Sequence, residues 1–183
     1  MTRFQPIYDL AELCARKGLK HVVLSPGSRC APLTLAFTRH PQLNCKIFSD
    51  ERTAAFTGLG MAQQTKQASV LLCTSDTAVY NFAPAVAEAC FSKTPLLIFT
   101  ADRPTEWIGQ QDGQTIYQEN IFGKHVKRSF QLPQDYEHPD SMWAINRIVN
   151  EAINEAHAHP QGPVHINAPF REPLYPNASE DFT

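Results

Sequence analysis

The sequence predicts an α/β protein of three layers, in which a mostly parallel sheet of about six strands lies between helices on both faces. Short continuous apolar runs alternate with longer segments in which apolar residues recur every three or four positions, and this alternation is typical of βα units. The chain has 183 residues, of which 43% are hydrophobic. A chain of this size and composition can bury one full core, so we expect a single domain.

The first part of the chain is predicted to alternate helix and strand: a helix at 5–17, a strand at 20–24, a helix at 31–39, a strand at 45–49 and a helix at 51–64. The strands are short apolar runs, and the helices show the 3.6-residue period. In the last of these helices, Ala55, Gly58 and Ala62 are small residues spaced by three and four. We expect them to let another backbone come close.

The remaining elements continue the pattern: a strand at 69–73, a helix at 77–91, and strands at 95–100, 125–130 and 163–167, with a helix at 139–158 before the last. The segment 105–124 shows neither period and is expected to be a loop with a short helix. From Pro169 the prolines are too dense for a helix or a central strand, because they lack backbone donors. We therefore expect one domain over 1–168 and a linker over 169–183.

Composition argues against several classes of partner. There are 16 basic and 18 acidic residues, without a basic stripe interleaved with aromatics, so nucleic acid is not expected to bind. No apolar run approaches the length of a membrane span, and the first residues lack a signal core. The five cysteines include no C-x-x-C pair. We expect a cytoplasmic protein with reduced thiols and no membrane partner.

Charged residues follow three of the predicted strands at the point where each strand ends. Arg29, Glu51 and Arg103 occupy these junctions, and open α/β folds build their sites at the carboxyl ends of strands. Guanidinium groups there suit bidentate capture of carboxylates. Each residue also has a simpler interpretation: Glu51 as an acid that complements a helix dipole, and the arginines as solvated loop charges.

Four segments stand at these junctions in a defined order and spacing: Ser25-Pro26-Gly27-Ser28-Arg29, Asp50-Glu51-Arg52, Thr74-Ser75-Asp76-Thr77-Ala78 and Thr100-Ala101-Asp102-Arg103-Pro104. Together they resemble the thiamine-diphosphate-dependent enzymes, and among these the synthases of menaquinone biosynthesis. The similarity extends from about residue 8 to Tyr175. It implies a pyrimidine-binding (Pyr) domain, the first of three domains in full-length family members.

The resemblance implies a role for individual residues. Glu51 matches the glutamate that activates thiamine diphosphate by sharing a proton with N1′ of its aminopyrimidine ring. The other positions that match cofactor-binding residues are Pro26, Gly27, Thr74 and Asn81. The positions that match residues binding the carboxylates and hydroxyls of the substrates are Ser28, Arg29, Arg103 and Gln114.

The activity that the resemblance implies is that of a transferase, which decarboxylates 2-oxoglutarate and adds the succinyl-semialdehyde carbanion to isochorismate. It also implies a homo-oligomer, a dimer or tetramer, because the Pyr domain of one chain faces the diphosphate-binding domain of its neighbour. In this superfamily Mg²⁺ or Mn²⁺ is held on that second domain by a Gly-Asp-Gly motif, which these 183 residues lack. We therefore expect no metal ligands in this chain and no turnover by the chain alone.

One residue departs from the family pattern, and two other functions stay open. The family usually has glycine where this chain has Asp76, so a local change of backbone or an added charge is expected there. The chain also fits a separate Pyr-type α subunit of a two-chain thiamine-diphosphate decarboxylase. Alternatively, it is a non-catalytic α/β binding module in which Glu51 is only a capping acid.

Overall fold

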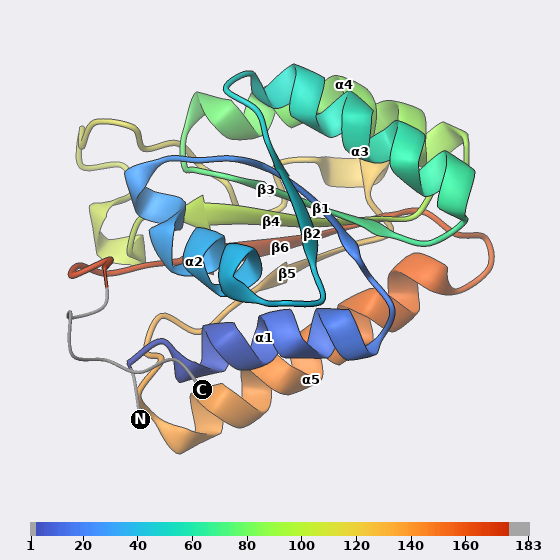
Figure 1. Cartoon of the computed structure of the whole chain (residues 1–183). Helices are drawn as coiled ribbons and strands as arrows, with labels where there is room; N and C mark the ends of the chain where they lie inside the picture. Colours follow the sequence, from blue (N-terminus) through green and yellow to red (C-terminus); the bar gives the residue numbers. More distant parts are fainter. Residues whose placement is uncertain (1–2, 176–183) are drawn as a thin grey trace.

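The computed structural model describes residues 3–175 and shows a sheet of six strands, all parallel, in the order β2-β1-β3-β4-β6-β5 (Figure 1). The strands are β1 (His21–Ser25), β2 (Asn44–Ile47), β3 (Ser69–Cys73), β4 (Leu96–Asp102), β5 (Arg128–Gln131) and β6 (Pro163–Pro169). Strands β3, β4 and β6 are buried along their whole length, whereas β2 and β5 form the edges. The predicted three-layer α/β fold is confirmed.

Helices cover both faces of the sheet. The helices are α1 (Gln5–Arg16), α2 (Ala31–Arg39), α3 (Glu51–Thr65), α4 (Thr77–Phe91) and α5 (Pro139–His157). Figure 1 shows α3 and α4 on one face and α1, α2 and α5 on the other. Successive strand residues point to opposite faces, so Val70 and Leu72 join the core under α1, α2 and α5, while Leu71 joins the core under α3 and α4.

The predicted elements differ from the observed ones mainly around β5. We predicted a strand over 125–130, but β5 begins at Arg128, where pairing with Val164 starts. The three residues before Val126 form the 3₁₀ turn η3 (Gly123–His125), and Val126 packs under α3 and α4. The apolar Val126 is therefore a buried residue that follows an exposed turn, and it does not belong to the strand. The connection 105–124 contains one further 3₁₀ turn, η2 (Thr105–Trp107).

The chain stays in the core for several residues after the predicted domain boundary. Strand β6 extends to Pro169, where a proline can end the ladder without needing a donor. Phe170 is fully buried and stacks on Tyr136 with ring centroids 5.3 Å apart, and Leu174 is buried as well. The boundary at 168 and the linker role of 169–183 stay predictions, and residues 176–183 lie outside the described part.

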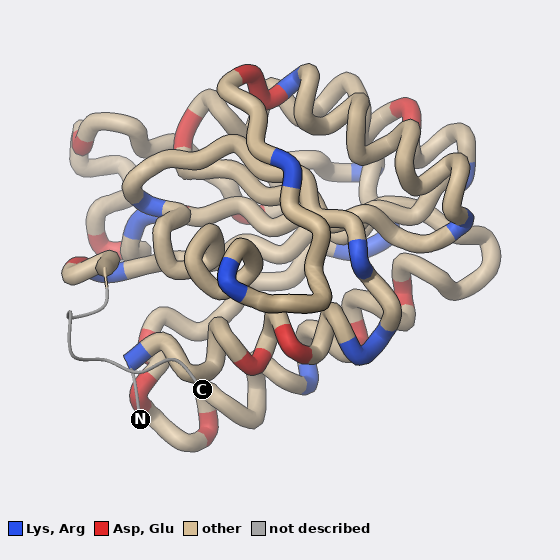
Figure 2. Tube along the Cα trace, viewed as in Figure 1, with Lys and Arg blue, Asp and Glu red and all other residues tan. Residues whose placement is uncertain are grey.

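Figure 2 shows basic and acidic residues interspersed over the face that it presents. No helix within residues 3–175 combines the length and the apolar character needed to cross a membrane.

Helix α3 lies against the sheet at Gly58. A Cβ atom at this position would come within 2.3 Å of Leu71 Cδ2, and Leu71 is fully buried in β3. The neighbouring Gly60 has no such contact, because a Cβ atom there would meet nothing within 4 Å. The small residues of this helix thus bring it close to the strand beneath it.

We expect Gly58→Ala to lower the free energy of unfolding by about 1 kcal/mol or more, because the added methyl overpacks Leu71. Gly60→Ala should instead raise it by about 0.5–1 kcal/mol through helix propensity alone. Urea unfolding of both variants measures the difference. Equal effects of the two substitutions would contradict the close approach at Gly58.

Candidate functional site

The candidate site lies at the carboxyl edge of the sheet, where strand order reverses. From β1 the chain passes to β2 on one side and then to β3 on the other, and both pair with β1 in parallel. Ligands of open α/β sheets bind at such a switch point. The segments that follow β1, β2, β3 and β4 carry the residues predicted from the sequence.

Glu51 is the first residue of α3, and it is not the capping residue of that helix. The cap is Asp50, whose Oδ1 accepts a hydrogen bond from the Thr53 amide at 2.7 Å. Hydrogen bonding by the Thr53 side chain, and then by its amide, lowers the pKa of Asp50. Glu51 is half-buried, and its Oε2 accepts a hydrogen bond from Asn81 Nδ2 at 3.2 Å. Two residues that the resemblance singled out separately therefore meet across α3 and α4.

Gly27 and Thr74 join the loops after β1 and β3. A Cβ atom on Gly27 would lie 2.6 Å from Thr74 Cβ, so this approach requires glycine. Pro26 and Ser28 on either side are exposed, whereas Arg29 is buried with only 8% of its surface accessible. The turn η1 (Ser28–Cys30) points the arginine inward.

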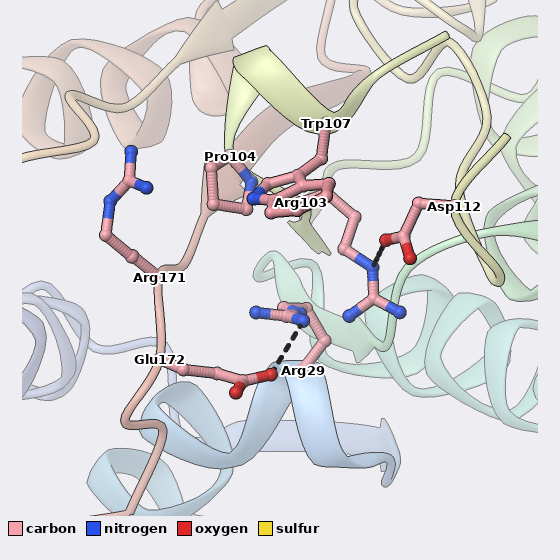
Figure 3. A pocket seen from close by; sticks show the side chains of 7 residues that line it. All are labelled: Arg29, Arg103, Pro104, Trp107, Asp112, Arg171 and Glu172. Atoms are coloured by element: carbon pink, nitrogen blue, oxygen red, sulfur yellow. Dashed lines mark hydrogen bonds and ion pairs between the residues drawn. The ribbon is translucent and has the colours of Figure 1, made fainter. Parts of the chain in front are cut away.

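Arg29 and Arg103 line one cavity of about 330 Å³ together with Pro104, Trp107, Asp112, Arg171 and Glu172 (Figure 3). Arg29 donates to the Phe170 carbonyl at 2.8 Å and pairs with Glu172 at 3.4 Å. Arg103 pairs through Nε with Asp112 at 3.0 Å and donates to the Gly113 carbonyl at 2.8 Å. The two arginines thus line one cavity, whereas Glu51, which we expected to face the same crevice, is not among its lining residues.

The electrostatics of this cavity favour an anion. Burial lowers the pKa of Arg29, and the charge of Arg103 lowers it further, while Glu172 and Asp112 act in the opposite direction. Arg29 Nε is buried without a hydrogen-bond partner among the described residues. A carboxylate between the two guanidinium groups would screen their repulsion and take up free donors.

Ser28 and Gln114 lie outside the lining of this cavity. Both are exposed. Gln114 has a positive φ of 56°, and its carbonyl accepts a hydrogen bond from Ser75 Oγ at 3.1 Å. It follows Gly113, the residue whose carbonyl binds Arg103. The structure therefore brings Gln114 close to the arginines without placing its side chain among the lining residues.

A buried polar network beneath the site was not predicted. Asn167 Nδ2 donates to Asp102 Oδ2 at 2.7 Å, and its Oδ1 accepts from Thr100 and from Gln118. Asp102 Oδ1 also accepts from the Arg103 amide at 2.7 Å; burial raises the pKa of Asp102, and these hydrogen bonds and the nearby arginines oppose that rise. Polar residues inside the apolar runs of β4 and β6 were the available signal.

His165 extends this network and is neutral in the folded state. Its Nε2 lies 2.8 Å from Thr100 Oγ1 and its Nδ1 lies 3.0 Å from Ser129 Oγ. Thr100 donates its own proton to Asn167, so His165 Nε2 is the donor and Nδ1 the acceptor. Burial lowers the pKa of His165 to about 3.

Asp76 has a backbone conformation that favours glycine, with φ 82° and ψ −146°. This region is essentially restricted to glycine, and other residues there are strained by about 1–3 kcal/mol. The structure thereby gives a physical reason for the family's preference at this position.

Comparison with known proteins gives the family. Residues 8–128 match the family described as "Thiamine pyrophosphate enzyme, N-terminal TPP binding domain". The chain belongs to this family. Its predicted membership of the thiamine-diphosphate-dependent enzymes is therefore confirmed, and thiamine diphosphate is the cofactor of the family.

Several curated relatives of this TPP binding domain carry the name "2-succinyl-5-enolpyruvyl-6-hydroxy-3-cyclohexene-1-carboxylate synthase". The protein of Cytophaga hutchinsonii is 54% identical over 179 residues, which is 98% of this chain and 32% of the relative. Those of Desulfotalea psychrophila and Porphyromonas gingivalis are each 46% identical, over 93% of this chain and 32% and 30% of the relatives. The chain spans about a third of the length of these relatives.

The chemistry of Glu51 and Asn81 fits the organic part of the cofactor. A carboxyl group suits a ring nitrogen, and the Asn81 amide donates to this carboxyl group at 3.2 Å. For the diphosphate, no three His, Cys, Asp or Glu side chains within residues 3–175 are grouped so as to hold a metal ion. The residues present thus fit the aminopyrimidine end of thiamine diphosphate.

We expect Asp76→Gly to raise the free energy of unfolding by about 0.5–2 kcal/mol, because glycine adopts this φ and ψ without strain. Asp76→Ala removes the same carboxylate but keeps Cβ, so it should give no such gain. Thermal unfolding of the two variants measures the difference. A similar gain in both would assign the effect to charge instead of backbone.

The free energy of unfolding should also decrease as the pH is lowered, because of His165. The unfolded imidazole protonates near its ordinary pKa of 6.5, whereas the folded one does so only at about 3. Between these values the unfolded state binds more protons, so the His165 contribution is lost as pH falls, by up to about 1.4 kcal/mol per pH unit. In His165→Asn, the slope of the unfolding free energy against pH between these two values should be smaller by up to about 1.4 kcal/mol per pH unit, which corresponds to one bound proton.

Proposed function

We propose that this chain is the Pyr domain of a 2-succinyl-5-enolpyruvyl-6-hydroxy-3-cyclohexene-1-carboxylate synthase, which decarboxylates 2-oxoglutarate and adds the succinyl-semialdehyde carbanion to isochorismate. The observation that carries the proposal is the pairing of Glu51 with Asn81 at the switch point, beside a cavity with two arginines. The shared name of relatives that match 98% and 93% of the chain supports the choice of reaction.

Glu51 is proposed as the catalytic residue. Thiamine diphosphate, when bound, supplies the carbon that attacks the 2-oxo acid and accepts electrons as carbon dioxide leaves. Glu51 holds a proton at N1′ of the aminopyrimidine, and the Asn81 amide fixes the carboxylate for this exchange. We propose that the aminopyrimidine ring lies against a wall formed by Gly27 and Thr74, where the two loops touch, and by the adjoining Pro26.

Arg29 and Arg103 are proposed to bind the substrates. Both 2-oxoglutarate and isochorismate carry two carboxylates, and planar guanidinium groups bind carboxylates in a bidentate manner. Ser28 and Gln114, which lie outside the lining of the cavity, are proposed as further polar contacts to the substrates. Trp107 and Pro104 complete the cavity on the side of η2 (Figure 3).

The rest of the active site is proposed to come from outside this chain. The diphosphate and a Mg²⁺ or Mn²⁺ ion would be held by the diphosphate-binding domain of a neighbouring chain, which makes the synthase a homo-oligomer, a dimer or tetramer. These 183 residues contain no Gly-Asp-Gly motif, which supports the proposal that another domain holds the diphosphate. The five cysteines, which include no C-x-x-C pair, support the proposal of a cytoplasmic enzyme with reduced thiols.

In the complete synthase, Glu51→Gln should leave the fold intact, because the new amide oxygen still accepts from Asn81. It should slow hydrogen–deuterium exchange at C2 of the bound cofactor by about 10²- to 10⁴-fold, because an amide cannot share the N1′ proton. NMR of the quenched cofactor measures this rate. Glu155→Gln, the same change on α5 in the opposite layer, should have no effect. An unchanged rate in Glu51→Gln would refute the proposed role.

Arg29→Ala and Arg103→Ala should each lower kcat/KM for 2-oxoglutarate or isochorismate by about ten- to a hundred-fold, since a lost charge-assisted hydrogen bond costs about 1.5–3 kcal/mol. The affinity for thiamine diphosphate should change much less. Arg147→Ala, which removes an exposed arginine paired with Glu151 on α5, is the matched control. Loss of cofactor affinity with normal substrate kinetics would show that the arginines serve the cofactor instead.

A further inference from the structure

The side chain of Gln118 connects three segments that are distant in sequence. Gln118 lies in the connection between β4 and β5 and is fully buried. Its Nε2 donates to the Ala101 carbonyl of β4 and to Asn167 Oδ1 of β6, both at 2.9 Å. Its Oε1 accepts a hydrogen bond from the Asp76 amide at 2.9 Å.

The orientation of this amide is fixed by its partners. The Asp76 amide is a donor and the Ala101 carbonyl is an acceptor, so only one placement of Oε1 and Nε2 satisfies both. Both protons of Nε2 and one lone pair of Oε1 are used. A buried side chain with such partners is rigid, because breaking any one bond leaves a buried polar group unsatisfied.

The bond to Asp76 holds a strained piece of backbone. Asp76 stands at φ 82° and ψ −146°, a conformation that persists only where the surroundings determine it. A second contact links the same two loops, from Ser75 Oγ to the Gln114 carbonyl at 3.1 Å. The loop after β3 is therefore held from the side of the 105–124 connection.

The Asp76 backbone leads directly into helix α4, which carries Asn81 of the proposed active site. Helix α4 begins at Thr77, and its first turn includes the bond from the Val79 amide to the Asp76 carbonyl at 3.0 Å. Asn81 lies four residues after Thr77, and its side-chain amide donates to Glu51. We propose that Gln118 is a positioning residue, which holds the Asp76 backbone and thereby sets the Asn81 amide against Glu51. This inference rests on the proposed function of Glu51.

A matched control lies in the same network. Gln131 Oε1 accepts from Asn167 Nδ2 at 3.0 Å, as Gln118 Nε2 donates to Asn167 Oδ1. Gln131 is in β5, and among the described residues it makes no hydrogen bond to the loop after β3. Gln131→Met therefore removes one hydrogen bond of Asn167, as Gln118→Met does, while leaving the Asp76 amide bonded.

The first measurement needs no cofactor. In Gln118→Met, amide hydrogen exchange of residues 79–81 should be faster by about tenfold or more, because the start of α4 opens when the Asp76 backbone is released. Gln131→Met should leave this exchange within about twofold of wild type. Equal protection in Gln118→Met and wild type would overturn the proposal.

The second measurement is C2 exchange of thiamine diphosphate in the complete synthase, well below the melting temperature. Gln118→Met should slow it by about ten- to a hundred-fold, as expected when a catalytic group is misplaced. Adding Asp76→Gly should recover most of the loss, because glycine keeps this φ and ψ without the restraint, whereas a general loss of stability would not be rescued in this way.

The two proposals fail differently. A normal C2 exchange rate in Gln118→Met, alongside a slow rate in Glu51→Gln, overturns the positioning role and leaves the proposed function in place. A slow rate in Gln118→Met that Asp76→Gly does not recover also overturns it. A normal rate in Glu51→Gln overturns the function of Glu51 and with it the catalytic part of the proposal, and amide exchange then still decides whether Gln118 holds the start of α4.

Discussion

The parallel pairing of β1 with both β2 and β3 is the constraint on which the site depends. Because all three strands run in one direction, the segments that follow them emerge at the same edge of the sheet. The chain moves outward to β2 before it returns to β3, so the loop after β1 leads to α2 on one face of the sheet and the loop after β3 leads to α4 on the other (Figure 1). Gly27 and Thr74 are where the two loops touch.

The polar residues inside β4 and β6 help to hold the loops that follow these strands. Thr100, His165 and Asn167 occupy positions that apolar residues would fill in an ordinary buried strand. Their hydrogen bonds satisfy one another, and Asn167 and Asp102 also reach the residues that shape the site. A buried network of this kind fixes geometry because each member would be costly to leave unpaired.

Much of the architecture followed from local pattern. The predicted helix over 51–64 and the run over 69–73 correspond to α3 and β3 almost residue for residue, since apolar period and strand length are properties of the chain itself. Strand β5 was placed too early because Val126 is apolar and buried without belonging to the ladder. Phe170 continues the core after Pro169, since the ring of Tyr136 is there to receive it.

The sequence by itself determined the fold class, the order of the elements and, through the motifs of a known family, Glu51, Asn81, Arg29 and Arg103 as the residues to examine. Only the tertiary structure decided which partners they have. It paired Arg103 with Asp112 and Arg29 with Glu172, and it placed Gln118 against the Asp76 amide. The physical reason is that periodicity reports which face of an element is buried, whereas a hydrogen bond between residues 42 positions apart depends on how the loops close over the sheet.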